Sequence, residues 1–292
     1  MTRSNVLRYR WGPAFAIKAV ALMALGVLVT NDAWLDILTI AMTDEESSHI
    51  FLVPIVLVWL VWVRRGRLRQ CRQDARWVGP LVVAAGWLMC SIGYHRAVQA
   101  FVHGGSVLVV VGCLLTVSGA QLVRHFLPAF VLLVFLVPVP GMVRLQIALP
   151  LQDTTAQVTH TLLQVLGIPV ALSGNVLEIN GAQVSIAEAC NGLRMVFALV
   201  LVSYAFAFGT PLRWYVRAII MAASPVSAIA CNVMRTIPTV WFYGYTSNEF
   251  ATQFHDVSGW IMLIASFLIL MGIIHLLRWA LVPVTRYTLA YD

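Results

Sequence analysis

Apolar residues along the chain form long uninterrupted runs, separated by short polar or charged segments. About eight of these runs are placed as helices that cross the roughly 30 Å hydrocarbon core of a bilayer. They cover residues 13–30, 50–63, 78–94, 104–122, 126–142, 193–209, 216–243 and 258–282. The pattern therefore predicts an all-α polytopic membrane protein with about eight transmembrane helices, built as a single integral membrane domain over residues 1–292.

One long segment, residues 144–189, departs from this pattern. Residues 145–166 alternate apolar side chains with Gln, Asp and Thr, which is typical of helices that lie along a membrane surface, and Pro150 favours a break there. In residues 167–186 two short apolar runs, VLEI and QVSI, flank the dipeptide Asn180-Gly181, which is typical of a β-hairpin turn. We predict an insertion of surface helices and a β-hairpin.

Charge indicates how these segments are oriented. Only 11% of the residues are charged and 60% are hydrophobic, which is far from the composition of a soluble domain. The net charge of +7 comes mainly from arginine, and the densest arginine run is residues 64–76. The positive-inside rule places that run and both termini in the cytoplasm, and residues 144–189 outside. The charge is therefore a topology signal, with the lipid bilayer as partner and no nucleic acid.

Reactive side chains gather just before the sixth apolar run, in VSIAEACNGLRM (184–195). This stretch contains Glu188, Cys190 and Arg194. Cys190 and Arg194 are four residues apart and would share a helix face. Cys190 has no disulfide partner near the outer face in this topology, so it is either incidental or a nucleophile. A simple ion pair between Glu188 and Arg194 at the end of a helix is the alternative.

Two later stretches carry polar groups at the same predicted level. Arg235 lies near the outer end of the seventh run, with Asn232 three residues earlier on the same helix face. An arginine that snorkels to water is the alternative there. His255 precedes the eighth run, where Asp256 or Ser258 would cap the new helix. Because Asp256 is adjacent to His255 in sequence, we expect its side chain to point elsewhere.

The predicted topology brings Cys190, Arg235 and His255 to one outer level on three successive helices. A sulfur, a guanidinium and an imidazole at one level would rarely meet by chance. We also considered Glu46 and His49, whose i, i+3 spacing can present two metal ligands, but a single pair is a weak signal. We expect no metal and no cofactor.

Several motifs occur in an order that resembles the exosortase and archaeosortase family of multi-span membrane transpeptidases, in its bacterial exosortase branch, over about residues 44–260. The motifs are SHIFLVP (48–54), VPVPG (137–141), LPLQ (149–152), VLGIPV (165–170), GNVLEI (174–179), EACNGLR (188–194), NVMR (232–235) and HDVSGW (255–260). One departure is Ile50, where a glycine is expected.

The resemblance implies a cysteine peptidase or transpeptidase with Cys190 as the nucleophile and with Arg235 and His255 completing the catalytic site. Arg194, Glu188 and Asn232 are then expected to bind substrate. The implied substrates are exported proteins with a C-terminal tail, made of a Pro-Glu-Pro-like motif, one transmembrane helix and a basic end. The resemblance also implies a bacterial inner membrane, with the active site at the periplasmic face.

Two alternatives involve the same residues. A non-catalytic component of envelope polysaccharide export or assembly would need Arg194 and Arg235 for lipid-linked sugar phosphates, but not Cys190. A purely hydrolytic intramembrane peptidase would differ only in using water to resolve the thioester. A transporter is disfavoured because the sequence has no paired broken helices in matching halves.

Overall fold

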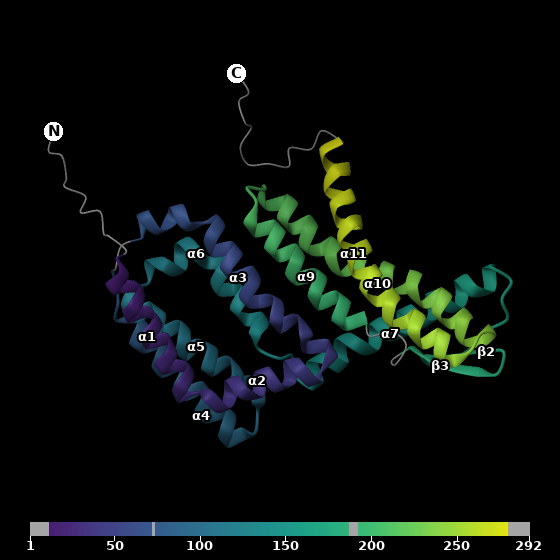
Figure 1. Cartoon of the computed structure of the whole chain (residues 1–292), viewed down its shortest axis with the longest axis horizontal. Helices are drawn as coiled ribbons and strands as arrows, with labels where there is room; N and C mark the ends of the chain where they lie inside the picture. The colour runs from purple at the N-terminus through teal and green to yellow at the C-terminus, as the bar shows by residue number, and fades with distance from the viewer. Residues whose placement is uncertain (1–11, 72–73, 187–191, 280–292) are drawn as a thin grey trace. The chain divides into compact units, whose positions relative to one another are not determined.

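The computed structural model describes residues 12–71, 74–186 and 192–279, and helices dominate these ranges (Figure 1). The chain divides into two compact units, Met1–Pro140 and Gly141–Asp292. In the described ranges, 5 helices are long and apolar enough to cross a membrane, or up to 7 if each of two broken helix pairs counts as one span. The helical membrane fold is confirmed, whereas the predicted count of eight spans is not.

The first unit is helical throughout its described part. Its elements are α1 (Pro13–Val29), α2 (Asn31–Thr43), η1 (Glu45–Phe51), α3 (Leu52–Val63), η2 (Arg65–Gln70), α4 (Val78–Arg96), α5 (Gln99–Ser118), α6 (Gln121–Leu132) and η3 (Leu133–Leu136). Four predicted apolar runs coincide with α1, α3, α4 and α5. The prediction missed α2, which meets α1 at 81°. His103 of α5 is 2% exposed and contacts Asp36 of α2 through Nε2 and Oδ2 at 2.8 Å.

Helices α4 and α5 pack with their backbones in close approach because glycines recur every seven residues on α4. These glycines are Gly79, Gly86 and Gly93. A Cβ added at Gly86 would lie 2.7 Å from the carbonyl oxygen of Gly105 and 2.8 Å from the backbone nitrogen of Val109. Small residues at such interfaces let membrane helices associate through van der Waals packing, since lipid provides little hydrophobic driving force between helices.

The second unit combines helices with one small sheet. Its described elements are α7 (Gly141–Val165), β1 (Ala171–Ser173), β2 (Val176–Ile179), β3 (Ala182–Ser185), α9 (Gly192–Gly209), α10 (Trp214–Tyr245) and α11 (Asn248–Trp279). Helix α7 continues through Pro150, so the break expected there is wrong. The helix continues despite the missing N–H of Pro150, and the Thr154 hydroxyl donates to the Pro150 carbonyl at 2.7 Å.

The predicted hairpin is confirmed. Strands β2 and β3 are antiparallel, from the pair Val176↔Ser185 to the pair Ile179↔Ala182. Between them Asn180 and Gly181 have φ values of 50° and 81°, and two positive φ values define the type I′ turn that Asn-Gly favours. The pattern missed β1, which pairs with the other edge of β2 to give the order β1-β2-β3.

The sheet packs against α7 and α10 around a small apolar core. The buried members of this core are Ala156, Leu163, Val170, Leu177, Ile179, Val184, Ile186 and Val240. Gly244 lets the sheet approach α10, because a Cβ there would lie 2.8 Å from Cγ1 of Ile179. The Asn180 side-chain amide also donates to the Gly244 carbonyl at 3.0 Å. These contacts fix β3 relative to the C-terminal third of α10.

Substituting Gly86→Ala should destabilise the protein by about 1–3 kcal/mol, because the new methyl group overpacks the α4–α5 interface. Thermal unfolding of the purified protein in detergent measures this loss. Gly272→Ala is the matched control, since Gly272 lies in α11 and nothing lies within 4 Å of the position that its new methyl group would occupy. Alanine is the better helix former there, so the control should be neutral or slightly stabilising. Equal behaviour of the two variants would contradict the close approach.

Candidate functional site

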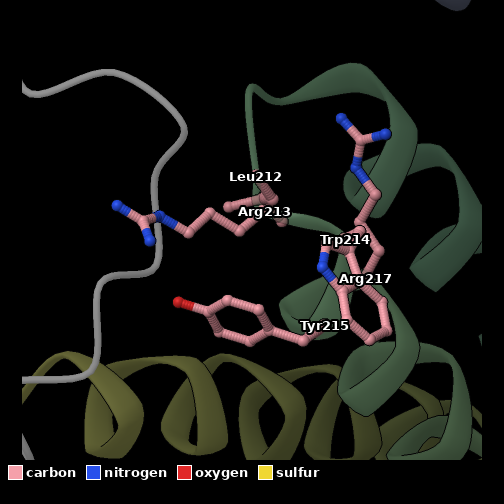
Figure 2. Close-up of a pocket in the computed structure, with 5 residues that line it drawn as sticks. All are labelled: Leu212, Arg213, Trp214, Tyr215 and Arg217. Carbon is pink, nitrogen blue, oxygen red and sulfur yellow. The ribbon is translucent and has the colours of Figure 1, made fainter.

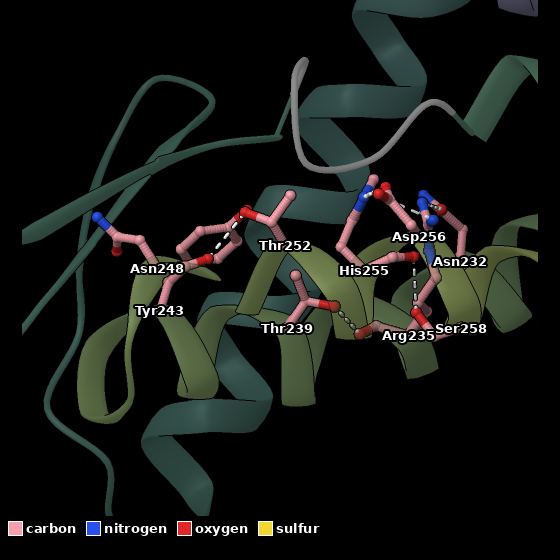
Figure 3. Close-up of polar contacts among 9 residues, drawn as sticks. All are labelled: Asn232, Arg235, Thr239, Tyr243, Asn248, Thr252, His255, Asp256 and Ser258. Carbon is pink, nitrogen blue, oxygen red and sulfur yellow. Dashed lines mark hydrogen bonds and ion pairs between the residues drawn. The ribbon is translucent and has the colours of Figure 1, made fainter. Parts of the chain in front are cut away.

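Helix α10 carries a buried polar face that centres on an arginine (Figure 3). Its buried polar residues are Ser224, Ser227, Asn232, Arg235, Thr236 and Thr239. Arg235 is only 4% exposed although its guanidinium is always charged. An arginine that snorkels would present its head group to water, so this burial argues against the snorkelling alternative. Helix α11 packs alongside α10 and supplies part of the cover.

The guanidinium of Arg235 bridges two helices. Nη2 donates to Oδ1 of Asn232 at 3.1 Å, and Nη1 donates to Nε2 of His255 on α11 at 3.4 Å. The Nε–H is buried and has no hydrogen-bond partner among the described residues. Gly259 makes room on α11, because a Cβ there would lie 3.2 Å from Nη1. Asn232 and Arg235 lie on one face of α10 as predicted and are hydrogen-bonded there, and His255 of α11 also contacts the guanidinium.

Asp256 completes a chain of contacts through the imidazole. A guanidinium can only donate, so Nε2 of His255 must accept from Arg235, and the proton of the neutral ring lies on Nδ1. Nδ1 in turn lies 3.1 Å from Oδ1 of Asp256 and can donate to it. The expectation that Asp256 points elsewhere is wrong. The His255 side chain is 19% exposed and that of Asp256 is 72% exposed, so this pair lies at the edge of the buried cluster.

The position of His255 within α11 also differs from the prediction. The helix begins at Asn248, so His255 lies about two turns inside it rather than ahead of it. Ser247 caps the start of the helix, since its Oγ accepts from the Phe250 amide at 3.4 Å and its carbonyl accepts from the Ala251 amide at 3.1 Å. Ser258, expected as a cap, donates to the His255 carbonyl at 3.0 Å in mid-helix. The missed signal was Ser247 before an acidic first turn.

The structure brings together Arg235, His255 and Asn232 from the predicted site. Arg194 lies half-buried at the start of α9. Cys190 and Glu188 lie outside the described residues. The structure therefore contains the guanidinium and the imidazole of the predicted site in contact, and the position of the thiol stays a prediction.

The cysteines in the described ranges do not resemble nucleophiles. They are Cys71, Cys90, Cys113 and Cys231, and all four are buried. Burial raises the pKa of the Cys71 thiol, which disfavours its thiolate. No group of three or more His, Cys, Asp or Glu residues in the described parts could hold a metal ion. His49 contacts the backbone carbonyl of Glu46 through Nδ1 at 3.0 Å.

A separate pocket of about 280 Å³ lies at the opposite end of α10 (Figure 2). Its lining residues are Leu212, Arg213, Trp214, Tyr215 and Arg217. The Arg217 guanidinium donates to the Thr210 carbonyl at 3.5 Å and stacks 5.2 Å from the Phe208 ring centroid. At about 1.5 Å per helical residue, Trp214 is roughly 32 Å from Arg235, so this pocket is not part of the Arg235 site.

Comparison with known proteins gives one match. A family model described as Transmembrane exosortase (Exosortase_EpsH) matches residues 34–272. The matched range includes Asn232, Arg235 and His255. No curated protein and no solved structure matches the sequence.

Removing the amide of Asn232 should destabilise the protein by about 1–3 kcal/mol, because Asn232→Ala leaves a buried guanidinium with one partner fewer. Thermal unfolding in detergent measures the loss. Thr239→Val is a suitable control on the same buried face, since the Thr239 hydroxyl bonds only the Arg235 carbonyl within α10, at 2.8 Å. If Asn232→Ala were no more destabilising than Thr239→Val, the Asn232 contact would not be what holds the guanidinium.

Proposed function

Because the chain belongs to the transmembrane exosortase family, we propose that it is a membrane cysteine peptidase and transpeptidase that cleaves C-terminal sorting tails through a thioester on Cys190. The observation that carries this proposal is the contact between Arg235 and His255. A buried cation held against a neutral imidazole provides an oxyanion partner and a proton acceptor in one place.

The proposed substrates are exported proteins whose tail has a Pro-Glu-Pro-like motif, one transmembrane helix and a basic end. We place the protein in a bacterial inner membrane with the site at the periplasmic face. The lengths of α10 and α11 support a site at the border of the membrane. Helix α10 has 32 residues, or about 48 Å, and Arg235 lies about 32 Å from its start. His255 lies about 36 Å from the end of α11, so both groups fall near the border of a hydrocarbon core about 30 Å thick.

In the first step the Cys190 sulfur attacks the carbonyl carbon of the scissile peptide bond. The thiol proton moves to Nε2 of His255, and an S–C bond forms as the carbonyl oxygen becomes an oxyanion. The Nη1 bond to Nε2 is long, at 3.4 Å, so the arriving oxyanion can draw that N–H away. This exchange frees the Nε2 lone pair as the negative charge develops.

In the second step the tetrahedral intermediate collapses. The C–N bond breaks, and the imidazolium returns its proton to the leaving amine, which departs with the transmembrane tail. Asp256 would stabilise the imidazolium by accepting from Nδ1. Water or an acceptor amine then attacks the thioester, and the sulfur leaves as a thiolate that is reprotonated. We propose that Arg194 and Glu188 bind the substrate and that Asn232 orients the Arg235 guanidinium.

Cys190→Ala and Cys190→Ser should both abolish tail cleavage, with a loss of at least about 10³-fold, because no other group supplies the nucleophile. Immunoblotting of a tailed exported reporter in cells measures the shift from precursor to product. Cys71→Ala is the matched control, since this buried cysteine is outside the proposed site. Normal cleavage in both Cys190 variants would remove the nucleophile and favour the polysaccharide-assembly alternative, in which Cys190 is dispensable.

Asp256→Asn should lower kcat about tenfold and leave KM nearly unchanged, because the carboxylate supports the imidazolium and not the bound substrate. Glu249→Gln is the control, as it removes an exposed carboxylate in the first turn of the same helix. Single-turnover cleavage of a detergent-solubilised tailed substrate separates the two parameters. Equal kcat in both variants would show that the contact between Asp256 and His255 has no positioning role.

A further inference from the structure

Strand β3 is an edge strand that leads toward the proposed nucleophile. In the order β1-β2-β3, no described strand pairs with the side of β3 that faces away from β2. An unpaired strand edge presents a row of N–H and C=O groups that readily pair with another extended chain. The chemistry of this edge therefore suits an extended polypeptide.

The register identifies which residues present these groups. The Ile186 amide donates to the Asn175 carbonyl at 2.9 Å, and these two residues continue the β2–β3 pairing by one step. Hydrogen-bonded pairs alternate along an antiparallel ladder, so Val184 and Ala182 also direct their backbone groups toward β2. Gln183 and Ser185 then direct theirs outward, along the unpaired edge.

The helix that supports the sheet packs against one of its faces. Val184 and Ile186 are buried in the apolar core that includes Val240 of α10, so α10 covers one face of the sheet. Gln183 is exposed and Ser185 is half-buried on the opposite face. An added strand beside β3 would therefore not displace the core.

The edge is also within reach of the proposed reaction. Ser185 and Cys190 are five residues apart in sequence, and a chain of that length spans at most about 18 Å. The other edge, on β1, lies more than a dozen residues from Cys190 and consists of only 3 residues. Of the two edges of this sheet, the β3 edge is therefore the nearer in sequence to the proposed nucleophile.

We infer that the substrate binds as a fourth strand on β3, with the extended segment next to the scissile bond pairing with the backbone of Gln183 and Ser185. This inference rests on the proposed function and specifies how its substrate is held. A substrate motif that has two prolines with one residue between them can bind in this way. Every second residue of an added strand turns its N–H away from β3, so both prolines can occupy those positions without losing a hydrogen bond.

Disulfide crosslinking tests the inference directly. The full-length chain with Cys190→Ala would carry either Gln183→Cys or Ser185→Cys, and an exported reporter with the tripartite tail would carry single cysteines through its motif and flanking residues. Facing side chains on paired strands have Cβ atoms about 4.5–5.5 Å apart, so a shift of up to about 1 Å brings them within the range of a disulfide. We expect one reporter position to crosslink with Gln183→Cys, and a position two residues away to crosslink with Ser185→Cys. Ser173→Cys, exposed on β1, is the matched control and should not crosslink.

No crosslink at any position, equal crosslinking along the whole motif, or equal crosslinking by Ser173→Cys would overturn the inference. Thermal unfolding of each cysteine variant in detergent shows whether its fold is intact, because the Gln183 and Ser185 side chains lie outside the buried core. If the unmodified chain cleaves the reporter but the folded cysteine variants fail to crosslink, only the strand docking is contradicted. If the variants crosslink as expected but the unmodified chain does not cleave, the proposed function is contradicted instead.

Discussion

The buried guanidinium of Arg235 is the constraint on which the rest of the site depends. An arginine cannot lose its charge, so a side chain that is only 4% exposed must find partners, and it finds them in Asn232 and His255. The first contact fixes its rotamer along α10, and the second ties α10 to α11. Because the guanidinium only donates, it also fixes the imidazole tautomer and directs the Nδ1 proton toward Asp256.

The second unit provides a rigid frame around this contact. The β-hairpin packs on α10 through an apolar core, and the close approach of Ile179 to Gly244 fixes the distance between the hairpin and the helix. Beyond the level of Arg235, α10 thus supports a strand whose chain continues to the proposed nucleophile. In this account the helices supply the charged and proton-transferring groups and the sheet supplies a backbone edge for the peptide. Helix α10 would then hold both the buried guanidinium and the strand that binds the peptide.

The features that could be predicted from the sequence are those that depend on residues close together along the chain. Asn180-Gly181 predicted the hairpin because only a few residues adopt two positive φ values, and the i, i+3 spacing placed Asn232 and Arg235 on one helix face, where they are in contact. Strand β1 was missed because three residues carry no alternation. The start of α11 was placed too late because polar residues interrupt the apolar pattern in its first two turns, although Ser247 marked the helix start. The contact of Asp256 with His255 depends on side-chain rotamers that adjacent positions do not reveal.

The most direct measurement is a double-mutant cycle between Arg235 and His255 on the single-turnover rate of tail cleavage. Arg235→Lys, His255→Gln and the double variant would be compared with the unmodified protein. If the two side chains act as a unit, the double variant should lose much less than the sum of the single losses, with a coupling of at least about 1 kcal/mol. Losses that add to within about 0.5 kcal/mol, or an unmodified protein that does not cleave, would contradict the account.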